Sequence, residues 1–280
     1  MGRNLVEKFR SEGHEVVVLD LPEHDVRNSK AMDEALRGVD SVHHLAYING
    51  TERFYTMPET VLSIAVRGIL NVLDAAVLNH VPEFFLCSSS EVYQTPPCYP
   101  TPEDVPLMIP DVMNPRYSYG GGKIISELMT VNWGRKFFKR ACIYRPHNVY
   151  GPGMGPYHVI PQITRNMLQG NFTIQGSGEE IRAFNYIDNF VQAVSTIQKH
   201  GEHLEVYHTG TPRETKIIDL ARMIAERLGY EEVDFVHKVS PPGGTKRRCP
   251  DISKLRSLGY QPQTTLEEGL DKTIAWLKSQ

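Results

Sequence analysis

A tyrosine and a lysine four residues apart, Tyr119 and Lys123, offer the most clearly defined chemistry in the sequence. Side chains at this spacing lie on one face of a helix. A free tyrosine has a pKa of about 10, but a neighbouring ammonium favours the phenolate and can lower that pKa toward about 7. Tyr-x-x-x-Lys also occurs by chance in many proteins. With a suitable surrounding, the pair would move a proton to or from a substrate hydroxyl.

The surrounding is supplied by a run of serines after an apolar segment. Residues 84–87 are typical of a short buried strand, and Ser88, Ser89, Ser90 and Glu91 follow it directly. One of these hydroxyls could share the substrate's proton with Tyr119. Ligands of open α/β sheets bind where strands end and helices begin, which is the arrangement expected here.

The elements that must position these residues alternate along the first half of the chain. We predict helices over residues 4–11, 31–36, 58–78 and from 119 onward, and strands over 15–20, 42–45, 84–87 and 141–144. Such alternation predicts an α/β fold, with a doubly wound parallel sheet and helices on both faces.

The texture of the sequence changes after the Pro- and Gly-rich stretch at 151–156. Helices are expected over 187–199, 217–228 and 266–277, with short strands between them, and residues 241–244 are expected to form an exposed loop. We therefore predict a nucleotide-binding domain over 1–150 and a smaller C-terminal lobe over 151–280, with some segments returning to the first domain.

Composition excludes several classes of partner. The chain has 280 residues, a net charge of −3 and 40% apolar residues, which gives no reason to expect nucleic acid. The longest apolar run, residues 61–81, is interrupted by Arg67, Asn71 and Asp74, so no membrane span is expected.

The cysteines and histidines show no metal-binding or disulfide pattern. The four cysteines lack CxxC spacing and the eleven histidines lack HxxxH spacing. No signal peptide is recognisable at the start of the sequence. A reducing, cytoplasmic setting and the absence of a metal are therefore expected.

An acidic residue at the end of the strand predicted over 15–20 indicates that the chain binds a dinucleotide. Asp20 follows the apolar residues 16–19. In a dinucleotide-binding fold, an acid here binds the adenosine ribose hydroxyls and repels a 2′-phosphate, although Asp is also a common turn residue. With the Tyr119 pair downstream, we favour NAD over NADP. The other residues expected around the nucleotide are Asp25, Val26, Leu45 and Ala46.

Longer motifs occur in a specific order along nearly the whole chain. They are VDSVHHLA at 39–46, GILNVLDAA at 68–76, SSSEVY at 88–93, the Tyr119–Lys123 motif, RPHNVYGP at 145–152, GSGEEIRAFNYID at 176–188 and RCPDISK at 248–254. In this order they resemble the extended short-chain dehydrogenases/reductases that act on nucleotide sugars, the NAD-dependent epimerase/dehydratase family. The resemblance implies a Rossmann-type sheet and NAD as cofactor.

The resemblance also implies a role for each matching residue. Tyr119 resembles the acid/base, Lys123 its tuning cation, and Ser89 the catalytic Ser or Thr, while Glu91 is placed to touch the sugar. The cofactor-binding residues implied are Gly2, Asp20, Asp25, Val26, Leu45, Ala46, Ser88, Tyr119, Lys123 and Pro146. The substrate-binding residues implied are Ser90, Asn148, Arg182 and Arg248, and the bidentate arginines suit a diphosphate.

Departures from the family pattern are concentrated at the front of the chain. The family begins with a strand and a Gly-x-x-Gly-x-x-Gly turn, but Gly2 here aligns with the last of those glycines. We therefore expect the first strand to be missing, an incomplete N-terminus, and weakened NAD binding. Ala65 also stands where many members have Asn, and Gly121-Gly122 replaces a frequent Ala-Ser.

The resemblance implies a reaction that starts with oxidation of the sugar 4-hydroxyl, with hydride transfer to NAD. A 4-epimerase is the favoured activity, because it needs only rotation of the keto sugar in the site and return of the hydride. A decarboxylase fits Ser90-Glu91 and Pro115-Arg116-x-x-Tyr119, whereas a 4,6-dehydratase would usually carry Asp-Glu there. An inactive nucleotide-sugar-binding homologue is the remaining alternative, because of the missing glycine turn.

The resemblance leaves the identity of the substrate open between UDP- and GDP-linked sugars. Its specificity is expected to depend on loops at 153–161 and 240–248. A homodimer formed by the helices over 58–78 and from Tyr119 is plausible, although their apolar faces would equally suit internal packing.

Overall fold

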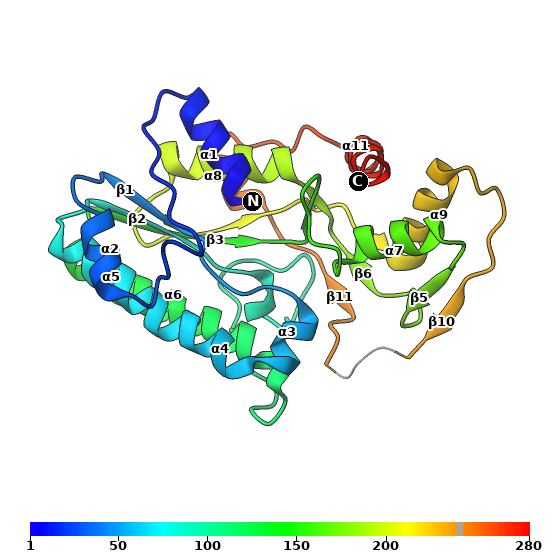
Figure 1. Ribbon diagram of the computed structural model, residues 1–280, viewed down its shortest axis with the longest axis horizontal. Coiled ribbons are helices and arrows are strands. Elements are labelled where there is room, and N and C mark those ends of the chain that lie inside the picture. Colours follow the sequence, from blue (N-terminus) through cyan, green and yellow to red (C-terminus); the bar gives the residue numbers. More distant parts are fainter. Residues whose placement is uncertain (240–242) are drawn as a thin grey trace.

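The computed structural model describes residues 1–239 and 243–280 and is built around a parallel sheet (Figure 1). Within these residues the strand order of the sheet is β1-β2-β3-β8, and every neighbouring pair is parallel. The strands are β1 (Ser41–His44), β2 (Glu83–Cys87), β3 (Arg140–Pro146) and β8 (Val206–Thr209).

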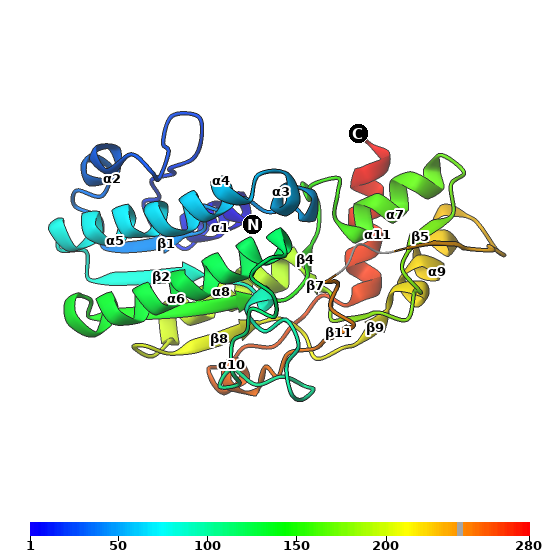
Figure 2. The same cartoon turned by 90° about the horizontal axis from the view of Figure 1, so that it is seen from below.

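Both faces of this sheet are covered by helices (Figures 1 and 2). One face packs against α1 (Gly2–Ser11) and α8 (Ile187–His200), and the other against α2 (Ser29–Ala35), α5 (Ile69–Leu78) and α6 (Ser118–Phe137). Successive residues of β2 alternate between the two cores, because side chains of a strand point to opposite faces. The predicted doubly wound α/β fold is confirmed.

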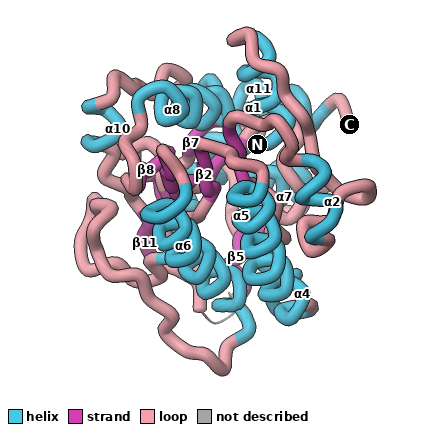
Figure 3. The backbone as a smooth tube through the Cα atoms, turned by 90° about the vertical axis from the view of Figure 1, so that its left-hand side faces the viewer, coloured by secondary structure: helices cyan, strands magenta, loops and turns pink. Residues whose placement is uncertain are grey.

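The predicted helix over 58–78 is continuous but not uniform. It consists of α4 (Pro58–Ser63), a π-helical turn η1 (Ile64–Gly68) and α5. It runs beside α6, as Figure 3 shows. Of the described residues, it is the helix long and apolar enough to cross a membrane, with a mean hydropathy of 1.9 in its best window.

Arg67, Asn71 and Asp74 therefore do not make this segment too short or too polar for a membrane span, contrary to the expectation from the sequence, because too few charges fall within the window. Half of the window is buried inside the structure, and the core helix of a globular protein meets the same criterion. Length and composition are thus weak support for a membrane span.

The strand predicted over 15–20 is also wrong. This segment is not paired with any described strand, and Val17 and Val18 are 61% and 51% exposed. Apolar β-branched residues favour extended backbone, but a strand forms only where a partner strand offers hydrogen-bonding groups. In the described sheet β1 is an edge strand and its ladder partner is β2.

The second half of the chain adds small sheets and three further long helices. Besides α8, its described helices are the long α7 (Val159–Leu168), α9 (Ile217–Leu228) and α11 (Leu266–Lys278), and the short α10 (Ser253–Ser257). Its strands are β4 (Val149–Tyr150), β5 (Thr173–Gln175), β6 (Ile181–Arg182), β7 (Asn185–Tyr186), β9 (Thr215–Lys216), β10 (Val236–Lys238) and β11 (Arg247–Arg248). The strand β8 returns to the main sheet beside β3. Part of the loop predicted at 241–244 lies outside the described residues.

Short elements close the edge of the sheet at which its parallel strands end. They are α3 (Thr51–Thr56) and the 3₁₀ turns η2 (Ser90–Val92) and η3 (Pro115–Tyr117). The turn η2 follows β2, and η3 leads directly into α6. This edge is therefore where the predicted site residues come together.

Candidate active site

The end of β2 and the first turns of α6 meet through Lys123. Its Nζ donates a hydrogen bond of 2.7 Å to the carbonyl oxygen of Cys87, the last residue of β2. Tyr119 and Lys123 share one face of α6 and are both buried. The predicted proton-transfer pair thus lies at a strand end, as the sequence indicated.

Tyr119 is enclosed by aromatic rings. Phe54 of α3 stacks on it with centroids 4.8 Å apart, and Tyr47, which follows β1, meets it edge-on at 4.9 Å. Burial raises the pKa of Tyr119 above its usual value, while a hydrogen bond with Ser89 acts in the opposite direction. The expected fall of this pKa is therefore not found, because the sequence could not show how deeply the phenol is buried.

Burial acts on Lys123 as well. It lowers the pKa of the ammonium to about 8, although Cys87 and Glu127 favour the charged form. The ammonium also lies 3.9 Å from the centroid of the Tyr47 ring, a cation–π contact. Lys123 is thus a charged group whose proton is held less tightly than that of an exposed lysine.

The three serines after β2 lie in different surroundings. Ser88 is buried and its hydroxyl donates to Glu127 of α6. Ser89 is half-buried, caps η2 by accepting from the amide of Glu91 at 3.2 Å, and bonds to Tyr119. Ser90 is buried. Ser89 is therefore the serine whose hydroxyl is hydrogen-bonded to the Tyr119 phenol.

The buried Glu127 belongs to a larger polar network behind the site. Its carboxylate receives Arg145 Nε at 2.9 Å and Nη2 at 2.6 Å. Arg145 also donates to the Tyr93 hydroxyl, which lies 2.6 Å from Nε2 of His208 in β8. The network thus links α6, β3 and β8 with the segment that follows β2.

Glu91 faces a cluster of arginines. Arg248 Nη1 lies 3.0 Å from Glu91 Oε1, and Arg116 Nη2 lies 3.7 Å from the same oxygen. Burial disfavours the charged carboxylate, but Arg248, Arg116 and Arg182 outweigh it and hold the pKa of Glu91 at about 2. Three guanidinium groups against one carboxylate leave this corner positively charged.

The arginine cluster is built by the second half of the chain closing on the first. Arg182 in β6 donates to the carbonyl of Thr245 at 2.7 Å, and Arg248 in β11 donates to its hydroxyl at 2.8 Å. Arg116 Nε in η3 donates to the carbonyl of Gly243 at 2.9 Å. The arginines are thus fixed by backbone and hydroxyl oxygens.

Asn148 lies between the strands β3 and β4 along the chain. Its backbone has a φ of 40°, in the left-handed region, and its side-chain amide donates to Ala183 at 3.3 Å. A left-handed Asn is tolerated because its short polar side chain bonds locally.

The sequence model of the NAD dependent epimerase/dehydratase family matches residues 1–210. The chain belongs to this family. It is 30% identical over 309 residues to UDP-glucose 4-epimerase of Mycolicibacterium smegmatis, covering all of this chain and 96% of that protein. It is 29% identical over 300 residues to UDP-glucuronic acid decarboxylase 1 of Xenopus tropicalis, covering all of this chain and 70% of that one.

A solved structure supports the same placement. The UDP-glucose 4-epimerase of Thermotoga maritima, determined with UDP-glucose, superposes with a TM-score of 0.90 at 26% identity, covering 99% of this chain and 95% of that one. The Rossmann-type fold of the epimerase/dehydratase family is thereby confirmed.

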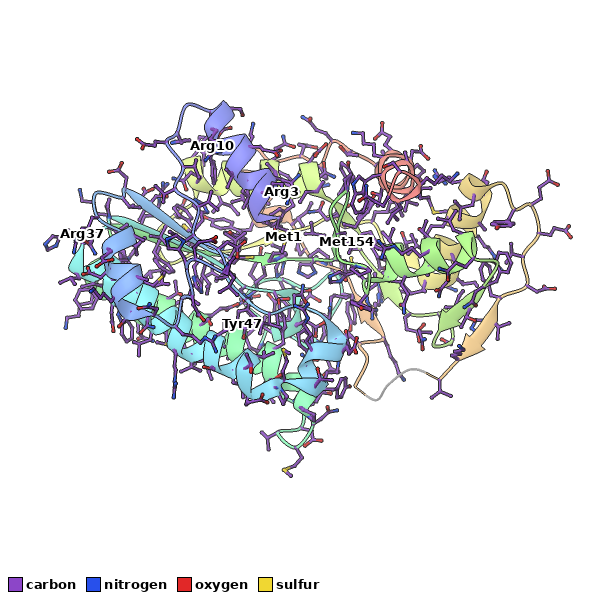
Figure 4. The ribbon with its side chains drawn as sticks, in the orientation of Figure 1. Met1, Arg3, Arg10, Arg37, Tyr47 and Met154 are labelled. Atoms are coloured by element: carbon purple, nitrogen blue, oxygen red, sulfur yellow. The ribbon has the colours of Figure 1, made fainter. Side chains whose placement is uncertain are left out.

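NAD is the cofactor of the epimerase/dehydratase family, and several residues of this chain fit it. The first turn of α1 begins at Gly2, and amides before Leu5 have no intrahelical acceptor, which suits an anion. Figure 4 shows Met1 and Arg3 at this end of α1, beside the strands. Asp20 is exposed, and its carboxylate accepts a hydrogen bond from the Leu21 amide through Oδ1.

The other predicted cofactor residues divide into two groups. Val26 is held by Asn71 of α5, which donates to its carbonyl at 3.0 Å. Leu45 packs against the core, and Ala46 and Pro146 are half-buried at strand ends. Asp25 is instead bound by Arg27, with Nη2 and Oδ2 2.6 Å apart, so its carboxylate is already paired.

Two residues of the site were missed from the sequence. Glu127 lies four residues beyond Lys123, so the helical spacing alone could have placed it on the same face. Tyr47 directly follows Ala46, and no spacing rule relates it to α6. Among residues 1–239 and 243–280, no cluster of His, Cys, Asp and Glu is placed to hold a metal ion.

Proposed function

We propose that the chain is an NAD-dependent epimerase of UDP- or GDP-linked sugars, acting through a 4-keto sugar. The observation that carries this proposal is the arrangement of Ser89, Tyr119 and Lys123 at the end of β2, facing an arginine cluster from the second half of the chain. The family and the relatives support the class of reaction.

In this proposal the chain's own residues hold the proton. Tyr119 takes the proton of the sugar 4-hydroxyl and later returns it, and the Ser89 hydroxyl shares that proton through its bond to the phenol. The nearby Lys123 ammonium favours the phenolate against the effect of burial. Bound NAD supplies the hydride acceptor and donor for the sugar carbon.

The same proposal assigns binding roles around the pair. The amides at the start of α1 would hold the NAD pyrophosphate and Asp20 a ribose hydroxyl. Arg182 and Arg248 would bind the diphosphate of the sugar nucleotide. Asn148 and Ser90 would contact its sugar and phosphate groups.

Glu91 favours epimerisation over dehydration. Loss of water needs a group that can donate a proton to the departing hydroxyl. Glu91 is held as a carboxylate by Arg248 and Arg116, with a pKa of about 2. An acid ionised so firmly at neutral pH is a poor proton donor.

A uronic acid decarboxylase is the second candidate, and Arg116 is the observation in its favour. This arginine lies three residues before Tyr119, within 3.7 Å of Glu91, so a guanidinium stands near the reacting pair. A carboxylated sugar would gain a charged partner there. The similarity to the Xenopus decarboxylase points the same way.

Product analysis separates these activities. The full chain is incubated with NAD and UDP-glucose, UDP-galactose, UDP-glucuronic acid or GDP-mannose, and products are followed by proton NMR. We expect a 4-epimer without net NADH. Release of CO₂ from UDP-glucuronic acid would establish the decarboxylase, and a 4-keto-6-deoxy product would establish the dehydratase.

Substitution Tyr119→Phe should lower kcat by about 10²-fold or more, because a positioned acid/base contributes roughly that much. The matched control is Tyr117→Phe, a phenol in η3 two residues earlier, which should keep its activity. Binding of a UDP-sugar by calorimetry without turnover in the unsubstituted chain would support an inactive homologue instead.

We also propose a homodimer formed by the α4–α5 and α6 surfaces. Apolar side chains on these helices remain exposed in the monomer, namely Leu62, Val66, Ile125 and Leu128. The substitution Leu128→Glu, at a side chain 60% exposed, should shift the chain to monomer in sedimentation velocity. Leu168→Glu on α7, 46% exposed, is the control, and equal behaviour of both variants would contradict the proposed surface.

A further inference from the structure

Tyr47 is a second phenol in the site. It lies three residues after β1, half-buried, in the layer between the sheet and the helices α4 and α6 (Figure 4). Its ring meets Tyr119 edge-on at 4.9 Å, and its hydroxyl lies 3.4 Å from the Tyr119 carbonyl oxygen. Tyr47 thus contacts both the ring and the backbone of the proposed acid/base.

The face of the Tyr47 ring also contacts the charged ammonium of Lys123. The ammonium lies 3.9 Å from the Tyr47 centroid but 5.8 Å from that of Tyr119. With Nζ bonded to the Cys87 carbonyl, the ring covers another side of the same group. An aromatic face attracts a desolvated cation, so this contact favours both the position and the charged form of Lys123.

The helix is shaped to admit this phenol. A Cβ on Gly122 would fall inside the van der Waals contact of the Tyr47 hydroxyl and 2.6 Å from the Cβ of Ala65. A larger residue at position 122 would displace the ring from Lys123. The departure noted at Gly122 thus makes room for the Tyr47 hydroxyl and for Ala65, the other departure noted in the sequence.

We propose that Tyr47 is a positioning residue that holds Lys123 protonated and directed at the Tyr119 phenol. The inference rests on the proposed function, since it assigns Lys123 the task of tuning Tyr119. It adds a contact that acts through the lysine and touches no reacting atom. Loss of the ring should therefore change the ionisation of Lys123 before it changes substrate binding.

The test compares three full-length variants with the unsubstituted chain. Tyr47→Phe keeps the ring, Tyr47→Leu removes it, and Phe54→Leu removes the other ring packed on Tyr119 without touching Lys123. The titration of Lys123 is followed by carbon-13 NMR of its Cε, assigned with Lys123→Met.

We expect the pKa of Lys123 to fall by about one unit in Tyr47→Leu and to stay within a few tenths of a unit in the other two, since a buried cation–π contact is worth about that much. An unchanged or raised pKa in Tyr47→Leu would overturn the proposal, because admitted water alone would raise it.

Kinetics provides the second readout. In Tyr47→Leu the alkaline limb of the kcat profile should move to lower pH by the same amount, with KM for the nucleotide sugar changed less than twofold. A larger change in KM with an unmoved limb would show a purely structural role. If the unsubstituted chain turns over no nucleotide sugar, the proposed function fails, whereas the Lys123 titration still decides the role of Tyr47.

Discussion

Glu91 shows how the neighbours of a residue decide its chemistry. A carboxylate beside a reacting sugar could act as an acid, a base or a fixed charge. Here Arg248, Arg116 and Arg182 hold its pKa at about 2, which makes it a fixed charge at neutral pH. The sequence placed Glu91 next to the serines and placed Arg182 and Arg248 at the substrate. It could not show that these arginines pair with Glu91, because they come from distant parts of the chain.

The substitution Glu91→Gln should therefore weaken the fold but strengthen anion binding. Removing the partner of buried guanidinium groups should lower the free energy of unfolding at pH 7 by about 1–3 kcal/mol. Free UDP, measured by calorimetry, should bind more tightly because its diphosphate no longer competes with a carboxylate.

The control is Glu267→Gln, which removes a carboxylate paired with Arg213 and with a pKa also held at about 2, away from the site. It should leave UDP binding unchanged. Weaker UDP binding in Glu91→Gln would contradict the assignment of the arginine cluster to the diphosphate.

At the scale of elements, glycines near the start of α6 lower the helix propensity but allow neighbouring groups to lie close to the helix backbone. A Cβ on Gly120 would lie 2.9 Å from the carbonyl of Glu91, and one on Gly122 would collide with Tyr47 and Ala65. Gly121 faces only the Ile109 side chain, at 3.4 Å. Of these three glycines in the first turns of α6, Gly120 and Gly122 are therefore required by packing, whereas Gly121 is not.

We expect Gly122→Ala to destabilise the chain by about 1–3 kcal/mol, because the neighbouring helix and the Tyr47 ring must move. Gly121→Ala is the matched control and should be neutral or stabilise by up to about 1 kcal/mol, since alanine restricts the unfolded chain. Chemical denaturation of both variants is the measurement. Equal stabilities would show that the Tyr47 contact does not need a glycine.

The elements themselves were largely predictable. Residues 84–87 and 141–144 gave strands, and the helix starting near Tyr119 was correctly placed, because apolar period and length are local properties. Residues 15–20 have the same local appearance but are not paired in the described sheet. Pairing, burial and the Tyr47 contact depend on residues brought from elsewhere, which no local pattern encodes.

At the scale of the whole molecule, buried or half-buried histidines lie on both edge strands of the sheet. Burial lowers the pKa of His43 and His44 in β1 from 6.5 to about 4 and about 3, and that of His208 in β8 to about 3. The unfolded chain takes up these protons near pH 6.5, whereas the folded chain does not. Their contribution to stability is therefore complete above about pH 6.5 and is lost as the pH falls toward 3.

The free energy of unfolding, measured by denaturant titration, should accordingly fall between pH 6.5 and 4. In His44→Leu the slope of the free energy of unfolding against pH should correspond to an uptake of about one proton fewer on unfolding. One titrating group is removed in this variant, while the buried volume is kept. The difference between the two proteins at pH 8 gives the packing effect alone. Parallel curves across this range would show that His44 does not take up a proton on unfolding.

The return of β8 to the main sheet affects how the chain folds while it is being synthesised. β3 gains its second neighbour only when Val206–Thr209 has been made, after α7 and α8. Until then, one edge of β3 would have no neighbouring strand in a nascent chain. Its free backbone groups could then pair with other chains. Aggregation during translation should thus depend on how quickly the ribosome passes from Pro146 to Thr209, and synonymous codons in that interval become a determinant of yield.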